Sequence, residues 1–363
     1  MLKERILFIG IGQGGGNITK EFEDLGYATY YINTSFEDLK TLETDAENLF
    51  HIKNAKGCAK DRDKALKYAL KSYDPICDSI YSKFPNYDII FIVNGAGGGT
   101  SAMSYILMEI MSVKFPEKLF NVISALPHRQ ESLLVFNNAI KSLEELLEKF
   151  EERDNVRSIF LLDNNVKQNK EDFLEINTEF AIAFDKMFGY TGTNITGNID
   201  GEELETLLLD KGFSVIFEFE SDDFKMGIAK SITEGIFSKW NTDCNYIGAI
   251  LDKRFSKEPI SEVIEENFGV PLADFITYDD ESGNVFMATG MSFNRSVLRS
   301  LKSETKSKLT RKQEIESNVD EDEDDIDIDI SSFTNKVKKK TTQPKKDATK
   351  ELLSILDKYK IKE

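Results

Sequence analysis

The chain has 363 residues, 40% of them hydrophobic, which is enough for two domains with a substantial core and a charged tail. A formal net charge of −18 argues against broad nucleic-acid binding by the folded body, although a basic tail segment is still able to bind it. Three cysteines without a CxxC pair and only two histidines leave little material for a disulfide framework, a zinc site or a histidine triad. No leader-like or bilayer-spanning apolar segment is found, so we expect a cytoplasmic protein without a membrane partner.

The first predicted element is an apolar strand at 5–11, followed by the glycine-rich turn GQGGGN at 12–17 and an amphipathic helix. Gly10, Gly12 and Gly15 satisfy the GxGxxG fingerprint of dinucleotide-binding folds. The next strand, at 28–32, ends in Asn33 rather than in the acidic residue that binds a ribose hydroxyl. An NAD site therefore has only this one motif in its favour.

A second glycine-rich turn lies at 94–101, between an apolar strand at 89–93 and a helical pattern that begins near Met103. Adjacent glycines let backbone N–H groups close around an anion, and the following helix directs its positive dipole end to the same place. Thr100 and Ser101 add hydroxyl donors. A plain tight turn is the alternative, but two such turns on one sheet favour a long polyphosphate. The GxxxxGK[ST] P-loop is absent.

The segment 57–62 is either a third phosphate-side turn or a solvated helix start. After the second glycine turn we expect the strand Leu119–Leu126, the helix Ser132–Phe150, the strand Ser158–Leu162 and the long helix Asp172–Phe188. Strands that alternate with helices predict a doubly wound parallel sheet, with ligands at the carboxyl ends of the strands.

Asp200 and Glu203 stand three residues apart at the start of a predicted helix, Gly201–Asp210. This spacing matches a capping box, in which both side chains only fix the helix terminus. Neighbouring carboxylates on one turn are also suited to chemistry. The pattern by itself is compatible with both roles.

The second half of the chain reads as a smaller α/β unit. Its predicted elements are the strand Val215–Phe219, a helix around Lys225–Trp240, the strand Tyr246–Leu251, the helix Pro259–Phe268, and a hairpin of Asp274–Tyr278 with Val285–Thr289.

The tail begins with a charged helical pattern at 295–317, continues with an acidic run at 320–329, and then becomes basic. At the end, Leu352, Ile355, Leu356 and Tyr359 have the spacing of a short amphipathic helix. Such a helix is marginal alone, which suggests a docking peptide, with a solubilising tail as the alternative.

The segments RILFIGIGQGGGN, YINTS, FIVNGAGGGTS, FLEIN and TGNIDGEELETL, in this order, resemble the tubulin/FtsZ superfamily over roughly residues 1–295. The resemblance implies a GTP-binding domain at 1–171, a central helix with a catalytic loop at 172–200 and a second α/β domain at 201–294. It also implies a C-terminal helix at 295–317, a disordered linker at 318–346 and a short tail helix at 347–363.

The resemblance also implies site residues. It assigns phosphate binding to Gly12, Gln13, Gly14, Gly15, Gly97, Gly98, Gly99, Thr100 and Ser101; guanine or ribose binding to Asn17, Asn33 with Thr34, Glu131, Phe173 and Asn177; and catalysis to Asn198, Asp200 and Glu203. An aromatic ring stacks on a base, and an amide reads the edge of guanine. The chain departs from the family where Ser101-Ala102-Met103 replaces the usual GTG and where Glu203 replaces an Asp.

In the superfamily, GTP is bound with Mg²⁺, and the acids of one subunit position the water that attacks the γ-phosphate on the next. The resemblance thus implies a head-to-tail homopolymer, with no metal ligand assigned on the protein. The long charged last helix and basic tail resemble TubZ, whose filaments segregate plasmid or prophage DNA through a DNA-binding adaptor. An FtsZ-like division filament or a phage DNA-centring filament is the alternative, and an NAD-dependent oxidoreductase is a remote one.

Overall fold

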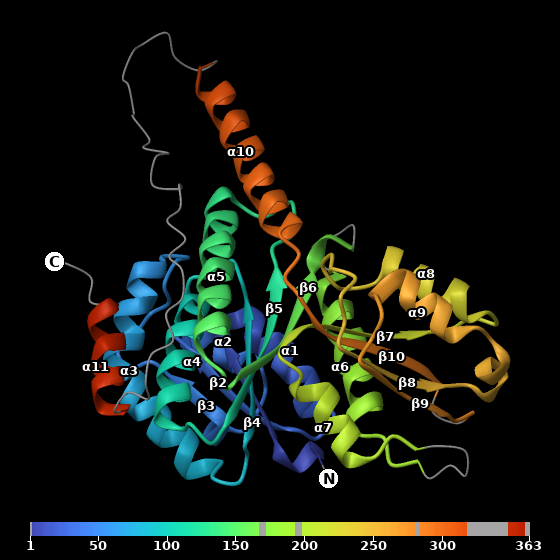
Figure 1. The fold of residues 1–363 in the computed structure, drawn as a ribbon. Helices are drawn as coiled ribbons and strands as arrows, with labels where there is room; N and C mark the ends of the chain where they lie inside the picture. The colour runs from blue at the N-terminus through green and yellow to red at the C-terminus, as the bar shows by residue number, and fades with distance from the viewer. Residues whose placement is uncertain (1, 167–171, 193–197, 281–282, 318–347, 360–363) are drawn as a thin grey trace.

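The computed structural model describes residues 2–166, 172–192, 198–280, 283–317 and 348–359, and Figure 1 shows their arrangement. The strands are β1 Ile6–Ile11, β2 Ala28–Asn33, β3 Leu49–His51, β4 Ile89–Gly95, β5 Leu119–Leu126, β6 Val156–Asp163, β7 Gly212–Phe219, β8 Tyr246–Leu251, β9 Ala273–Tyr278 and β10 Asn284–Met291. The α-helices are α1 Gly12–Asp24, α2 Phe36–Lys40, α3 Arg62–Lys83, α4 Met103–Lys114, α5 Leu133–Glu152, α6 Phe173–Phe188, α7 Gly201–Leu209, α8 Phe224–Glu234, α9 Ile260–Phe268, α10 Ser296–Ser317 and α11 Ala348–Lys358. Short 3₁₀ turns include η1 Leu2–Arg5 and η3 Thr100–Ala102.

One ten-stranded sheet runs through the described part of the chain, in the order β3-β2-β1-β4-β5-β6-β7-β10-β8-β9. All strands from β3 to β7 pair in parallel. Every residue of β1 is buried, because helices cover both faces of this part of the sheet. The predicted doubly wound parallel sheet is confirmed, and the carboxyl ends of β1, β4 and β5 meet at one edge.

The second half of the sheet corrects one prediction. The strands expected to form a hairpin, β9 and β10, do not pair with each other, because β8 lies between them. β10 is antiparallel to both β7 and β8, whereas β9 is parallel to β8. The turn signal between β9 and β10 is local, and it carries no information about which strand completes each ladder.

A second correction concerns the helix predicted around Lys225–Trp240. The helix α8 ends at Glu234, immediately before Gly235. The chain then runs alongside the end of β6, where Asp163 N donates to Ile236 O and Ser238 N donates to Leu161 O, at 2.8 and 2.9 Å. Pairing with the sheet edge replaces the last turns of the expected helix.

The long helix α6 lies between the two halves of the molecule and packs against α1, β7 and β10 (Figure 1). Its apolar face enters an aromatic cluster in the core. Phe184 packs edge-on against both Phe22 and Phe91, with ring centroids 5.4 Å apart in each pair. The prediction of a long central helix is therefore confirmed.

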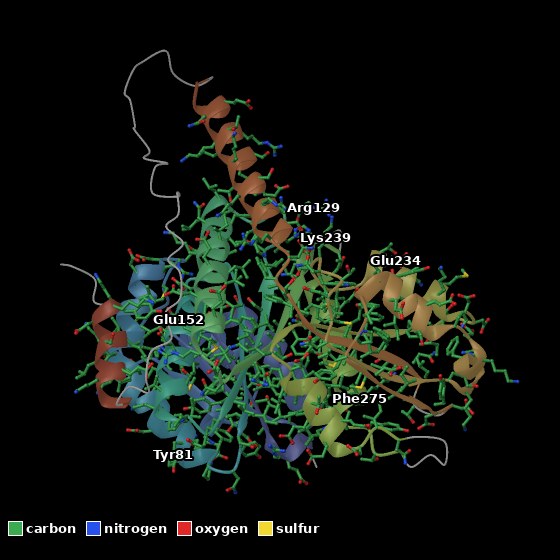
Figure 2. All side chains as sticks on the ribbon, in the orientation of Figure 1. Tyr81, Arg129, Glu152, Glu234, Lys239 and Phe275 are labelled. Carbon is green, nitrogen blue, oxygen red and sulfur yellow. The ribbon has the colours of Figure 1, made fainter. Side chains whose placement is uncertain are left out.

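The helix α10 packs on α5 and then extends away from the body (Figure 1). About midway along it, Lys308 Nζ donates to the carbonyl oxygen of Arg129, which Figure 2 labels beside this helix. The predicted linker at 318–346 lies outside the described residues. No helix in the described ranges is long and apolar enough to cross a bilayer.

The tail helix α11 corrects the expectation that the terminal segment has little to pack on. It returns to the body and contacts α4. Ile355 is only 4% exposed, and Leu352, Leu356 and Tyr359 pack against the main core. The apolar face was predicted correctly, but it is covered by the body of the same chain.

Candidate nucleotide-binding site

A cavity of about 640 Å³ opens at the carboxyl ends of β1, β4 and β5. Its wall includes most of the predicted site residues, namely Gly12, Gln13, Gly14, Asn17, Gly97, Gly98, Gly99, Thr100, Ser101, Glu131 and Phe173. Three of them, Gly12, Gln13 and Gly14, belong to the first turn of α1, and the backbone N–H groups of a first helical turn have no partner within the helix. Such a helix terminus suits an anion.

The two glycine-rich turns touch each other across this wall. A Cβ on Gly14 would lie 3.4 Å from Gly95 Cα, and one on Gly12 would lie 3.3 Å from Thr100 Cβ. Gly12 also has a φ of +74°, which L side chains rarely adopt. The turns therefore form one continuous surface, as expected for a polyphosphate held from both sides.

Gly15 does not line the cavity but lies directly behind it. A Cβ at this position would stand 2.2 Å from the carbonyl oxygen of Val93 on β4. The glycine lets α1 approach the sheet closely, and this approach places the first helical turn against the cavity.

Asn33 is also behind the wall, 2% exposed, and it holds other residues in place. Its Oδ1 accepts from Thr100 Oγ1 at 3.4 Å, and its Nδ2 donates to Asp38 at 3.3 Å. The hydroxyls of Thr34 and Thr100 are 2.7 Å apart, and Cys58 Sγ donates to Thr34. This network ties the loop after β2 to the second glycine turn.

The segment 57–62, predicted as a phosphate-side turn or as a helix start, leads from the cavity wall into α3. It lines the cavity, and Asp61 then caps α3 by accepting from Lys64 N at 3.0 Å. Gly99 packs so closely on it that a Cβ there would lie 2.7 Å from Lys60 Cα.

Sequence reasoning missed Lys60. Among the described residues that line the cavity it is the cationic one, and its Nζ is 3.7 Å from Glu131 Oε2. A single lysine between two glycine-rich turns gives no pattern that distinguishes it from a surface lysine.

Phe173 contributes an aromatic ring to the cavity wall. Phe173, half-buried at the start of α6, lies with its ring centroid 5.5 Å from that of His128. His128 is fully buried and its Nδ1 accepts from Gln130 N, so it supports the loop after β5. Asn177, one turn along α6, is 5% exposed and does not line the cavity.

The three predicted catalytic residues do not line this cavity. Asp200 Oδ1 accepts from the backbone N–H groups of Glu202 and Glu203, and Asp200 N donates to Glu203 Oε2, each at 2.9 Å. The capping box is thus present at the start of α7. Asn198 and Asp200 are exposed and Glu203 is half-buried.

The helix α7 belongs to the opposite edge of the sheet. Its Glu205 pairs with Arg5, which immediately precedes β1, and Arg5 also pairs with Asp88, which precedes β4. This is the amino end of the parallel strands, whereas the cavity is at their carboxyl end. A strand the length of β1 separates the two edges by about 20 Å.

A comparison with known proteins agrees with this architecture. The model of the tubulin/FtsZ family GTPase domain matches residues 5–166. The tubulin-like protein TubZ of the Clostridium botulinum C phage is 31% identical over 324 residues, 88% of this chain and 88% of the relative.

Solved structures are similar over most of the chain. A tail-truncated TubZ of C. botulinum phage c-st superimposes with a TM-score of 0.77 at 30% identity, over 86% of this chain and all of that one. A GTPγS-form protofilament of Bacillus thuringiensis serovar israelensis TubZ shares the fold, with a TM-score of 0.74 at 19% identity over 86% and 94% of the chains.

Proposed function

The chain belongs to the tubulin/FtsZ family and hydrolyses GTP, and we propose that it does so in a head-to-tail polymer whose neighbouring copies share each site. In this arrangement one copy holds GTP in the cavity between its glycine-rich turns. The next copy presents Asn198, Asp200 and Glu203 at the edge that faces this GTP. A head-to-tail contact of this kind does not close on itself, so it generates a filament.

The separation of the cavity from α7 carries this proposal. Asp200 begins α7, which packs at the amino ends of the parallel strands, whereas the cavity lies at their carboxyl ends, and a strand such as β1 is about 20 Å long. A carboxylate that positions a water molecule has to stand within hydrogen-bond reach of it. The acids of a chain are therefore too far from their own GTP, but a stacked neighbour brings the two edges together.

Within the cavity, the backbone of the two glycine-rich turns would bind the phosphates, and Lys60 would add positive charge near them. Phe173 would stack on the base. The neighbouring copy's Asp200 and Glu203 would orient the attacking water, since phosphoryl transfer depends mainly on positioning and on stabilisation of charge.

The described residues contain no group of three acidic, histidine or cysteine side chains that could hold a metal ion. Mg²⁺ in nucleotide sites takes most of its ligands from phosphate and water and only one or two from side chains. We assign the side-chain oxygens of Gln13 and Asp38, both on the cavity wall, as candidate ligands. Bound there, Mg²⁺ would neutralise charge on the phosphate oxygens.

The test is the dependence of GTP turnover on protein concentration. If each site needs two copies, phosphate release per molecule rises with concentration and reaches a plateau as filaments form, which light scattering detects. NAD is expected to produce neither scattering nor turnover. A turnover per molecule that stays constant from dilute to concentrated protein would contradict the shared site.

We further propose that the filament segregates plasmid or prophage DNA through a DNA-binding adaptor held by the C-terminal tail. The likeness to a phage TubZ and the basic residues at 336–346 support this role, and the formal net charge of −18 favours an adaptor over direct binding of DNA by the body. Residues 318–363 used as bait should retain a small DNA-binding protein encoded on the same replicon. Retention of division-site membrane proteins instead would favour the FtsZ-like alternative.

A further inference from the structure

The tail helix α11 covers a surface that is built for it. The helix α4 beneath is buried at every position from Met103 to Val113. A helix that is buried all round needs a cover on each side. The sheet, α3 and α5 provide most of this cover, and α11 provides the rest.

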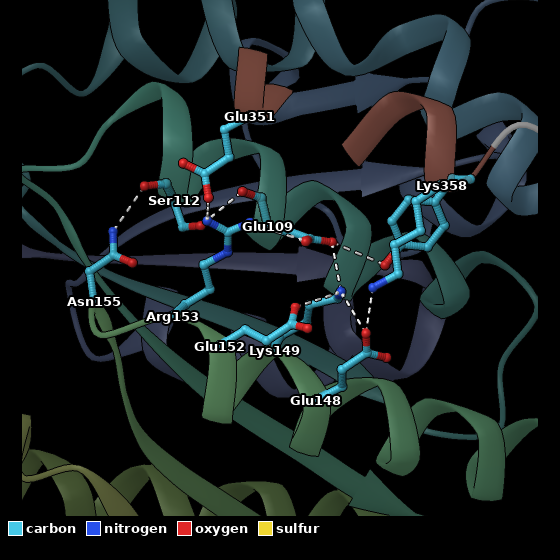
Figure 3. A network of polar contacts seen from close by, with 10 residues as sticks. Glu109, Ser112, Glu148, Lys149, Glu152, Arg153, Asn155, Glu351 and Lys358 are labelled. Atoms are coloured by element: carbon cyan, nitrogen blue, oxygen red, sulfur yellow. Dashed lines mark hydrogen bonds and ion pairs between the residues drawn. The ribbon is translucent and has the colours of Figure 1, made fainter. Parts of the chain in front are cut away.

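Charged groups line the same surface, as Figure 3 shows. Glu109 on α4, 2% exposed, is 2.9 Å from Nζ of the fully buried Lys149 on α5. Arg153 Nη2 donates to the other carboxylate oxygen of Glu109 at 3.2 Å. These three side chains come from the body alone, and neither the cavity nor the catalytic loop uses them.

Residues near both ends of α11 join this network of ion pairs and hydrogen bonds. Glu351 pairs with Arg153, and Lys358 pairs with Glu148. Tyr359 donates from its hydroxyl to Glu109 Oε2 at 3.1 Å. Burial, together with the adjacent Glu109, raises the pKa of Tyr359, so this hydroxyl remains a donor.

The face of α11 that contacts the body is its apolar face. Ile355 is almost completely buried, whereas Leu353 on the other side is 56% exposed. Any protein that recognises the apolar face of α11 would need the same side chains that α4 and α5 already contact. Two such contacts cannot exist at once.

We propose that α11 is a self-ligand: the surface of α4 and α5 is a docking site for this helix, and a protein that binds the apolar face of α11 must first displace it. The contact is suited to exchange, because Ile355 is the one buried residue among the described side chains of α11 and the ion pairs of Glu351 and Lys358 lie at the rim of the contact.

The test uses the full chain without added nucleotide and measures amide hydrogen exchange in residues 348–359. In the unmodified chain we expect the amides of α11 to be protected from exchange, but less than those of α4. The double charge reversal Glu351→Lys/Lys358→Glu should lower the protection factors of α11 at least tenfold, and Ile355→Asp should abolish the protection. The matched control Lys350→Glu reverses a charge on the exposed side of the same helix and should change nothing.

A labelled peptide of residues 348–363 then probes the docking site directly. It should bind the Glu351→Lys/Lys358→Glu chain at least tenfold more tightly than the unmodified chain, whose own helix blocks the surface. Unaltered basal GTP turnover in these variants shows that the body is folded.

Three results would overturn the proposal: equal peptide binding to both chains, exchange in α11 as slow as in α4, or no effect of either disruptive variant. Protection that increases with protein concentration would also overturn it, because the occupant would then be the tail of a second copy.

Discussion

Replacing Asp200 by Asn should reduce GTP turnover by about 10²- to 10⁴-fold, the range typical for loss of a residue that handles the reacting water. Asn is as good a helix N-cap as Asp, so the start of α7 should be preserved. GTP binding should also be preserved, because Asp200 does not line the cavity of its own chain. Phosphate release at saturating GTP and equilibrium binding of a fluorescent GTP analogue measure the two effects separately.

This substitution separates the two roles that the sequence left open. A residue that only caps α7 is replaced by Asn without loss of activity, whereas a catalytic carboxylate is not. Glu202→Gln is the matched control, since Glu202 is an exposed acid in the same turn and only its backbone contacts Asp200. Full turnover in Asp200→Asn would refute the catalytic assignment.

A Gly15→Ala chain should lose about 3 kcal/mol of stability, the upper end of the usual cost of overpacking. The new Cβ would lie 2.2 Å from the carbonyl oxygen of Val93, which is backbone and cannot rotate away. The helix α1 must then move away from β4, and the first turn of α1 moves with it. If the free energy of GTP binding becomes less favourable by the same amount, the affinity decreases by about 100-fold.

The neighbouring Gly16→Ala is the control. A Cβ at Gly16 would meet only side-chain atoms of Leu42, at 3.3 Å, and these can shift. Alanine also favours a helix over glycine by roughly 0.5–1 kcal/mol, so this variant should unfold no earlier than the original chain. Chemical denaturation and GTP titration of both variants check the prediction. Equal behaviour of the two would show that the approach of α1 to β4 is not critical.

The two variants together test the shared site. The Asp200→Asn chain binds GTP but lacks the catalytic acid, and the Gly15→Ala chain has the acid but binds GTP poorly. A Gly15→Ala copy can still present its intact Asp200 to a GTP-loaded neighbour. A mixture should therefore regain turnover that neither has alone, provided the Gly15→Ala chain is folded at the assay temperature.

The sequence predicted β1, β2, β4, β5 and β6 because their signals are local, whereas the three-residue β3 was not predicted. The run at 89–93 is apolar at every position, which is what a strand covered on both faces requires. The glycine-rich turns that follow β1 and β4 were also predicted from a local signal. Glycine occurs where the backbone lies so close to a ligand or to another strand that a Cβ would not fit.

The missed features depend on contacts that are distant in sequence. The backbone of Lys60 packs against Gly99, which is distant in sequence, and the ring of His128 contacts Phe173 from a separate loop. The pairing of β10 with β7 and β8 is likewise set by the whole sheet rather than by the turn before it. The periodicity of the tail identified which face of α11 is apolar, but could not identify α4 as its cover.

The position of α4 has a thermodynamic consequence. Its first residue follows directly after the turn η3, so the helix under the tail begins where the second glycine-rich turn ends. Release of α11 then involves α4, and occupation of the cavity involves the turn directly before it. If bound GTP changes the equilibrium constant for tail release by some factor, then tail release changes the affinity for GTP by the same factor. This follows because the free energies around a closed thermodynamic cycle sum to zero.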